Sequence, residues 1–153
     1  VWAITPAVRA NFSASWVDPE LTEDAPGLGS DGDRLPGAPK YNLSLGIQGD
    51  FDIYEKPAFV RADLVYVGEY YNNLQQTGEA AGDYTTLGLR GGVSLGHFQL
   101  EVYVNNTTNE IARTWIGAEL GMGRNYVIRP RTIGLQIKYS LSQHWNDLLS
   151  FCV

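Results

Sequence analysis

The stretch Phe98-Gln99-Leu100-Glu101-Val102-Tyr103-Val104-Asn105 places an apolar side chain at every second position and a mainly polar one between them. This period of two indicates a β-strand with one apolar and one polar face. The same alternation recurs in five other stretches. It predicts an all-β chain with about six strands, at residues 7–17, 41–48, 60–67, 84–93, 98–105 and 133–141.

The predicted strands are joined by connections of two lengths. Short ones lie at residues 49–57 and 94–97, and long ones, rich in Gly, Asn, Asp and Glu, lie at residues 18–38, 71–83 and 107–129. In an antiparallel up-and-down meander this alternation places every long loop at one end. Outer-membrane barrels have that asymmetry, with short periplasmic turns and longer extracellular loops.

Strand length and charge distribution favour a membrane wall over a soluble sheet. The six predicted strands have 8–11 residues, close to the roughly 9–11 that a tilted strand needs to cross a bilayer, whereas strands of soluble proteins average about 5–6. Within these six stretches, every charged side chain lies on the polar face and none lies on the apolar face, as a lipid-facing wall requires. Aromatic side chains near strand ends suit the headgroup level: Trp16, Tyr41, Tyr66, Tyr70 and Tyr139.

Composition excludes several classes of protein. A net charge of −6 argues against nucleic acid as a partner. The single cysteine, Cys152, excludes an internal disulfide framework. No apolar stretch reaches the roughly 18 residues of a membrane-spanning helix. The chain starts at Val1 rather than at a methionine, so we expect a piece of a longer protein.

Six strands are too few to close a transmembrane barrel, because about eight is the smallest number in such proteins. An open sheet in lipid would leave unpaired edges that neither water nor lipid can satisfy. The predicted strands therefore need neighbours from elsewhere in a longer chain.

A series of short blocks appears along the chain in a fixed order: ITP at residues 4–6, SWVD at 15–18, GDRLPGAP at 32–39, YVGEYY at 66–71, FQLEVYVNN at 98–106 and PRTIGL at 130–135. In this order and spacing the chain resembles the C-terminal barrel region of TonB-dependent outer-membrane receptors, over residues 4–141. Each block is weak alone, and the combination carries the resemblance.

The resemblance implies part of a transmembrane barrel of about 22 strands with a plugged lumen, located in the bacterial outer membrane. Such a receptor imports a scarce nutrient, such as a siderophore-iron complex, cobalamin or a glycan, with energy from the TonB complex. The implied partners are outer-membrane lipid, the rest of the barrel, the plug domain and the nutrient. No enzymatic activity, cofactor or nucleic acid is implied.

The C-terminal end departs from the family pattern. Barrels of this kind end on an aromatic residue in the last strand, and Leu141 stands in that place. We expect residues 1–141 to be barrel strands and residues 142–153 to be an irregular extension without strand period.

Five charged residues on the polar faces are the candidates for contact with a substrate, for a lumen ion-pair network or for contact with the plug: Arg61, Asp63, Arg90, Glu101 and Lys138. We favour the network or plug role. Residues 27–32 match GxGxxG, but no helix can open there, so we reject nucleotide binding. The acidic segment at residues 18–33 could hold Ca²⁺, although its carboxylates lack regular spacing.

Two alternatives remain open on the sequence. One is a small soluble β-barrel or sandwich that encloses Phe98, Leu100, Val102 and Val104 and binds an apolar ligand. The other is a small stand-alone outer-membrane barrel, which needs residues 1–6 and 142–153 as two further strands.

Overall fold

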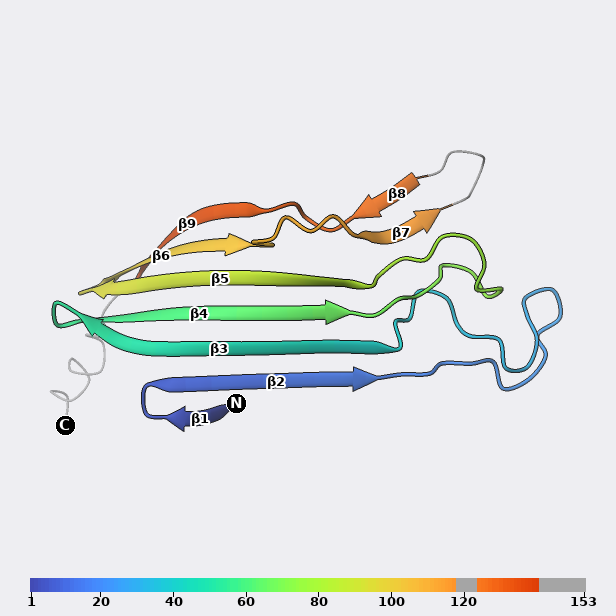
Figure 1. Cartoon of the computed structure of the whole chain (residues 1–153), viewed down its shortest axis with the longest axis horizontal. Helices are drawn as coiled ribbons and strands as arrows, with labels where there is room; N and C mark the ends of the chain where they lie inside the picture. The colour runs from blue at the N-terminus through green and yellow to red at the C-terminus, as the bar shows by residue number, and fades with distance from the viewer. Residues whose placement is uncertain (118–123, 141–153) are drawn as a thin grey trace, which may run out of the picture.

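The computed structural model describes residues 1–117 and 124–140 (Figure 1). The strands in these residues are β1 (Trp2–Thr5), β2 (Val8–Trp16), β3 (Tyr41–Ile53), β4 (Lys56–Val67), β5 (Tyr84–Leu95), β6 (Phe98–Asn105), β7 (Arg113–Gly117), β8 (Arg124–Val127) and β9 (Thr132–Tyr139). No helix among the described residues is long and apolar enough to cross a membrane.

Seven of these strands form one antiparallel sheet in the order β1-β2-β3-β4-β5-β6-β9. Strands that follow one another in sequence also pair in space, except that the β7–β8 hairpin intervenes before β9. The long connections all lie at one end and the tight turns at the other (Figure 1). The predicted all-β meander, with its loops at one end, is confirmed.

The predicted count of six strands was too low, for two reasons. The first is β1, which has only four residues and is too short for periodicity to detect. The second is the β7–β8 hairpin, which lies inside the long connection predicted at residues 107–129. The predicted extension at residues 142–153, and Leu141 itself, lie outside the described residues.

The predicted connection at residues 49–57 was wrong. β3 continues to Ile53 and β4 starts at Lys56, which pairs directly with Ile53. The turn is only Tyr54 and Glu55, with φ of 46° and 62°. Two positive φ values are typical of the tight hairpin turn that matches strand twist, but Gly and Asn normally occupy it. The absence of those residues concealed the turn.

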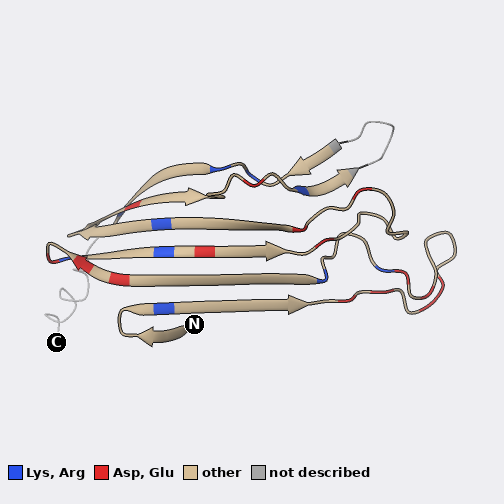
Figure 2. Cartoon of the chain, in the orientation of Figure 1, with Lys and Arg blue, Asp and Glu red and all other residues tan. Residues whose placement is uncertain are grey.

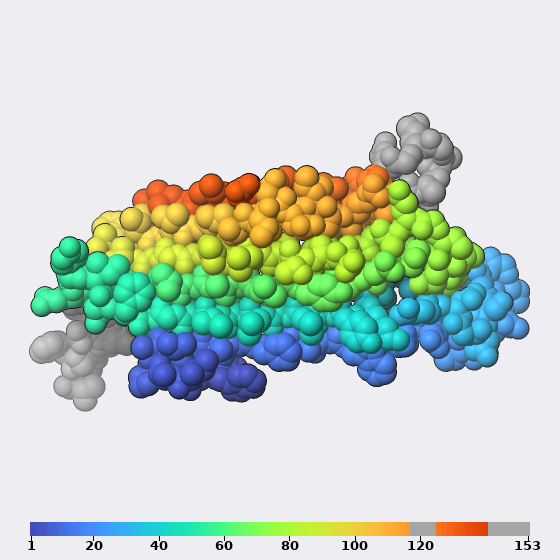
Figure 3. All heavy atoms as spheres, viewed as in Figure 1, coloured from blue at the N-terminus to red at the C-terminus, as the bar shows by residue number. Residues whose placement is uncertain are grey.

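One face of the sheet is apolar from edge to edge. Phe12 lies opposite Leu45, Leu45 opposite Leu64, and Leu64 opposite Leu87. These side chains cover no interior: Phe12 is 56% exposed and Leu135 is 63% exposed. The only buried apolar residues described are alanines. The strands of the seven-stranded sheet lie side by side across the face that Figure 3 shows.

The soluble alternative is therefore wrong, because Phe98 and Val102 remain half exposed instead of lining a closed interior. The sheet order also places β1 and β9 at opposite edges, so the described strands do not close into a barrel. β1 supplies one of the two further strands that the stand-alone alternative required.

Aromatic side chains limit the apolar band at both ends. Trp16 lies opposite Tyr41 at the loop end, and the rings of Phe98 and Tyr139 are 4.9 Å apart at the turn end. Tyr41 and Phe51 on β3 are separated by about 33 Å along the strand, or about 25 Å across a bilayer at the usual tilt. That height fits a membrane. Tyr70, predicted among the aromatic residues at the strand ends, lies in a loop instead.

The exposed apolar face and the two open edges predict how the isolated chain behaves. Purified without detergent it should be insoluble and associate edge to edge, because β1 and β9 each leave backbone groups unpaired. Size-exclusion chromatography in plain buffer measures this. A sharp monomer peak with a cooperative thermal transition would contradict a wall that needs lipid and neighbouring strands.

Candidate functional site

Strand alternation places charged side chains on the face opposite the apolar one. Figure 2 marks the positions of these charged residues along the strands. Arg61 on β4 lies opposite Arg90 on β5, and Arg90 lies opposite Tyr103 on β6. Glu101 lies opposite Gly92 on β5 and Gln136 on β9. The register thus brings charges from four strands into neighbouring rows of one surface.

All five candidate residues join into one set of contacts, which we call the charge ladder: Arg61, Asp63, Arg90, Glu101 and Lys138. Arg61 Nε donates to Asp63 Oδ2 at 2.9 Å. Arg90 lies 3.8 Å from Asp63 on one side and 3.8 Å from Glu101 on the other. Lys138 Nζ donates to Glu101 Oε2 at 3.2 Å. Arg90 therefore links the β4 pair to the β6–β9 pair.

A second cluster continues the polar face toward β2. Arg9 donates through Nε and Nη2 to Asp50 Oδ2 at 3.1 and 2.7 Å, and Gln48 Nε2 donates to Asp50 Oδ1 at 2.8 Å. Arg61 Nη2 also reaches Asn11 Oδ1 on β2, at 3.0 Å. Asp50 was missed because residues 49–57 were interpreted as a turn. Continued alternation through Phe51 and Ile53 could have identified it.

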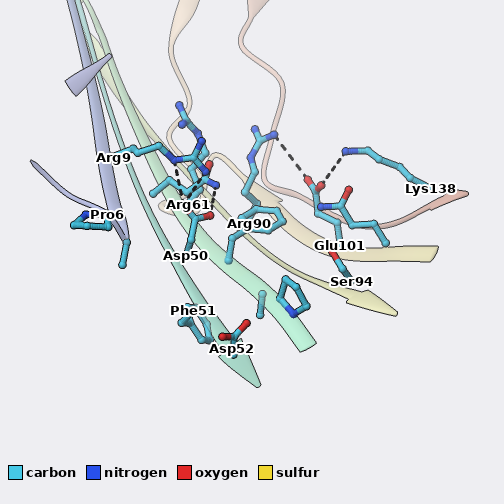
Figure 4. Close-up of a pocket in the computed structure, with 16 residues that line it drawn as sticks. Pro6, Arg9, Asp50, Phe51, Asp52, Arg61, Arg90, Ser94, Glu101 and Lys138 are labelled. Atoms are coloured by element: carbon cyan, nitrogen blue, oxygen red, sulfur yellow. Dashed lines mark hydrogen bonds and ion pairs between the residues drawn. The ribbon is translucent and has the colours of Figure 1, made fainter. Parts of the chain in front are cut away.

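Glu101 is the most buried charge of the ladder. It is 5% exposed, whereas the side chains of Arg90 and Lys138 are 41% and 52% exposed. A carboxylate removed from water needs charged or hydrogen-bonding partners, and two cations supply them here. All members of the ladder except Asp63 line, together with the Arg9–Asp50 cluster, a hollow of about 760 Å³ near the turn end (Figure 4).

Glycines on the polar face let large side chains lie flat on the sheet. A Cβ at Gly46 would overlap Arg61 Nη2 and come within 2.9 Å of Asp63 Oδ1. A Cβ at Gly92 would lie 2.6 Å from the ring of Phe59, and one at Gly134 would overlap the ring of Tyr103. The packing of the ladder against the sheet therefore depends on Gly46.

The three long loops are hydrogen-bonded to one another beyond the strand ends. Gly37 N donates to Tyr71 O at 2.7 Å, and Gly82 N donates to Arg113 O at 2.9 Å. Tyr70 Oη donates to Thr114 O at 2.6 Å, and burial raises the pKa of this phenol. The loops thus continue the wall as one connected layer.

Asp18 anchors the first long loop at its base. Its carboxylate accepts from Lys40 Nζ at 2.6 Å and lies 3.0 Å from Arg34 Nη2. The hydrogen bond from Lys40, with a smaller contribution from Arg34, lowers the pKa of Asp18. A lowered carboxyl pKa means that this anchor is present at neutral pH and is lost only in acid.

The described residues contain no group of three His, Cys, Asp or Glu side chains arranged to hold a metal ion. Two carboxylates of the first loop bond to backbone instead: Asp33 Oδ2 accepts from Ser30 N at 2.8 Å and Asp24 Oδ1 from Asp31 N at 2.9 Å. Hydrogen bonds from backbone N–H groups to Asp side chains are typical of turns, so the loop geometry gives no support to the calcium alternative.

Comparison with known proteins assigns the family. The family model for the TonB-dependent receptor-like β-barrel matches residues 2–106, more than half of the chain. The chain belongs to this family. No curated protein sequence matches it significantly.

Two solved structures share the fold of this TonB-dependent receptor barrel segment. The ferric yersiniabactin uptake receptor FyuA from Yersinia pestis superposes with a TM-score of 0.79 and 19% identity, over 92% of this chain and 22% of that one. BauA, the ferric preacinetobactin receptor from Acinetobacter baumannii, superposes with a TM-score of 0.69 and 24% identity, over 89% of this chain and 20% of that one. The segment therefore spans about a fifth of each receptor.

The close packing at Gly46 yields one prediction for the full-length barrel that contains this segment. Gly46→Ala should lower its stability by about 1–3 kcal/mol, because the new methyl group displaces Arg61 from Asn11 and Asp63. Gly88→Ala is the matched control on the same face, since its Cβ would lie 3.8 Å from its nearest neighbours. Thermal unfolding in detergent compares the two, and equal losses would contradict the role of Gly46.

The burial of Glu101 yields a second prediction. Arg90→Met and Lys138→Met should each be mild, because Glu101 keeps one cation. The double variant should lose about 1 kcal/mol more stability than the sum of the losses in the two single variants, since it leaves a buried carboxylate without a cation. Adding Glu101→Gln should restore most of that loss. Additive effects, or no rescue, in thermal unfolding would show that Glu101 is not held by this pair.

Proposed function

We propose that the chain is part of the wall of an outer-membrane receptor that imports a scarce nutrient. The observation that carries the proposal is the segregation of its two faces: charged side chains interact across β2 to β9 on one face, while the other is apolar and exposed. A barrel wall has water or a plug on one side and lipid on the other. Members of this family are transporters.

The nutrient proposed first is a ferric siderophore, with cobalamin and glycans as the other classes. The support is that the two solved structures reported above are a ferric yersiniabactin uptake receptor and a ferric preacinetobactin receptor. Their likeness to this segment is one of fold, so the choice of ligand has to be tested directly.

The charge ladder is proposed to face a plug domain rather than the nutrient. The hollow that it lines also includes Pro6, Phe51, Pro57 and Ser94, which lie beside the tight turns. The turns are periplasmic in outer-membrane barrels, and a nutrient arrives from the loop end. A barrel of this size has a plugged lumen, so the plug is the partner within reach. Energy would come from the TonB complex acting on the plug.

Uptake by cells that lack their own receptors tests the nutrient class. Cells carrying the full-length receptor are supplied with labelled ferric siderophores, cobalamin or oligosaccharides, with and without a functional TonB complex. We expect TonB-dependent accumulation of a ferric siderophore. TonB-dependent accumulation of only cobalamin or a glycan would overturn the siderophore choice, and uptake of nothing in the panel would overturn the import proposal.

Separate measurement of binding and transport tests the ladder. Asp63→Asn should lower transport about tenfold, equivalent to about 1.4 kcal/mol of coupling, and leave surface ligand affinity unchanged, because a plug contact acts after binding. Ser44→Ala, on the same face, is the control and should change neither. A raised ligand Kd with Asp63→Asn would instead make the ladder part of the nutrient site.

A further inference from the structure

The apolar face contains a hollow that the transport proposal does not use. It has a volume of about 530 Å³ and crosses four strands. The outer groove, as we call it, is lined on this face by pairs from β3, β4, β5 and β6: Ile47 and Gly49, Val60 and Ala62, Leu89 and Gly91, Val102 and Val104. It is therefore an apolar depression in the exposed apolar face.

Two glycines open the groove. Gly49 lies opposite Val60, Val60 opposite Gly91, and Gly91 opposite Val102, so glycine and valine alternate along one row. Neither glycine has a positive φ. A Cβ at Gly49 would lie 3.8 Å from Val60, and one at Gly91 would lie 3.5 Å from Phe59 O. These are ordinary contacts, so the backbone geometry does not require glycine at either position.

A single cation stands on the same face at the turn end. Lys56 begins β4, and regular pairing from Lys56 to Val67 keeps Lys56, Val60 and Ala62 on one face. Every other charged residue in the described seven-stranded sheet lies on the polar face, by the same alternation. No ion pair involves Lys56 within the described residues. Val60 lies four positions after Lys56, or about 13 Å along the strand.

We propose that the outer groove binds an acyl chain of an anionic phospholipid whose phosphate pairs with Lys56. The apolar lining matches a hydrocarbon chain, and the cation lies at the end where the headgroup of a periplasmic-leaflet lipid would be. A lysine positioned at a lipid surface favours an anionic over a zwitterionic headgroup by about fivefold. This inference rests on the proposed membrane placement of the chain.

Photo-crosslinking in lipid nanodiscs tests the site in the full-length receptor. The probes are phosphatidylglycerol and phosphatidylethanolamine, each with a photoreactive group in one acyl chain, and crosslinked peptides are located by mass spectrometry. For the wild type we expect crosslinks concentrated on β3 to β6, with phosphatidylglycerol about fivefold above phosphatidylethanolamine.

Two variants test the contribution of the Lys56 charge and the contribution of the groove independently. Lys56→Gln should abolish the preference for phosphatidylglycerol, whereas Lys40→Gln, at the loop end, should preserve it. Gly49→Leu with Gly91→Leu should fill the groove and move the crosslinks to neighbouring strands. Ala14→Leu on β2 is the matched control for added bulk and should leave them in place.

The outcomes distinguish the lipid site from the membrane placement. Crosslinks spread evenly over the apolar face, or an unchanged pattern in the filled variant, would overturn the groove while leaving the placement intact. An unchanged headgroup preference in Lys56→Gln would overturn the role of the lysine. The absence of any lipid crosslink on the apolar face would overturn the placement itself.

Discussion

Unbroken antiparallel register between β2 and β6 is the constraint on which the rest of this structure depends. Backbone N–H and C=O groups in hydrocarbon have no water to hydrogen-bond with. Each strand must therefore form backbone hydrogen bonds with its neighbours along the whole length that crosses the membrane. Because side chains alternate, a slip of one residue would send Arg61 or Glu101 to the lipid side. Such a charge costs roughly 2–4 kcal/mol at mid-membrane, which makes the register strongly specified.

The same register places two like charges side by side and also places carboxylates next to them. It sets Arg61 directly opposite Arg90, a like-charge pair that alone would repel. Asp63 pairs with Arg61 along the strand and approaches Arg90, and Glu101 lies on the far side of Arg90. Glycine at position 46 leaves room for Arg61 to lie against the sheet. Charge alternation across strands thus stabilises a surface that is only partly exposed to water.

The two ends of the sheet are built differently. At the turn end, two-residue connections hold the strands in register, even where Tyr54 and Glu55 must adopt positive φ. At the loop end, long segments bond to one another through backbone groups and through Tyr70. The wall therefore continues past the strands into a connected layer. In the proposed receptor, an arriving nutrient would meet this layer first.

The sequence by itself determined the class of fold, the two faces and the placement of the five charged candidates on one of them, because period-two alternation depends only on local chain geometry. It could not determine contacts between strands, such as Arg90 between Asp63 and Glu101, because those depend on register. The tight turn at Tyr54, the short β1 and the β7–β8 hairpin carry no distinctive local signal. The tertiary structure decided them, since only pairing with a neighbouring strand makes these segments extended.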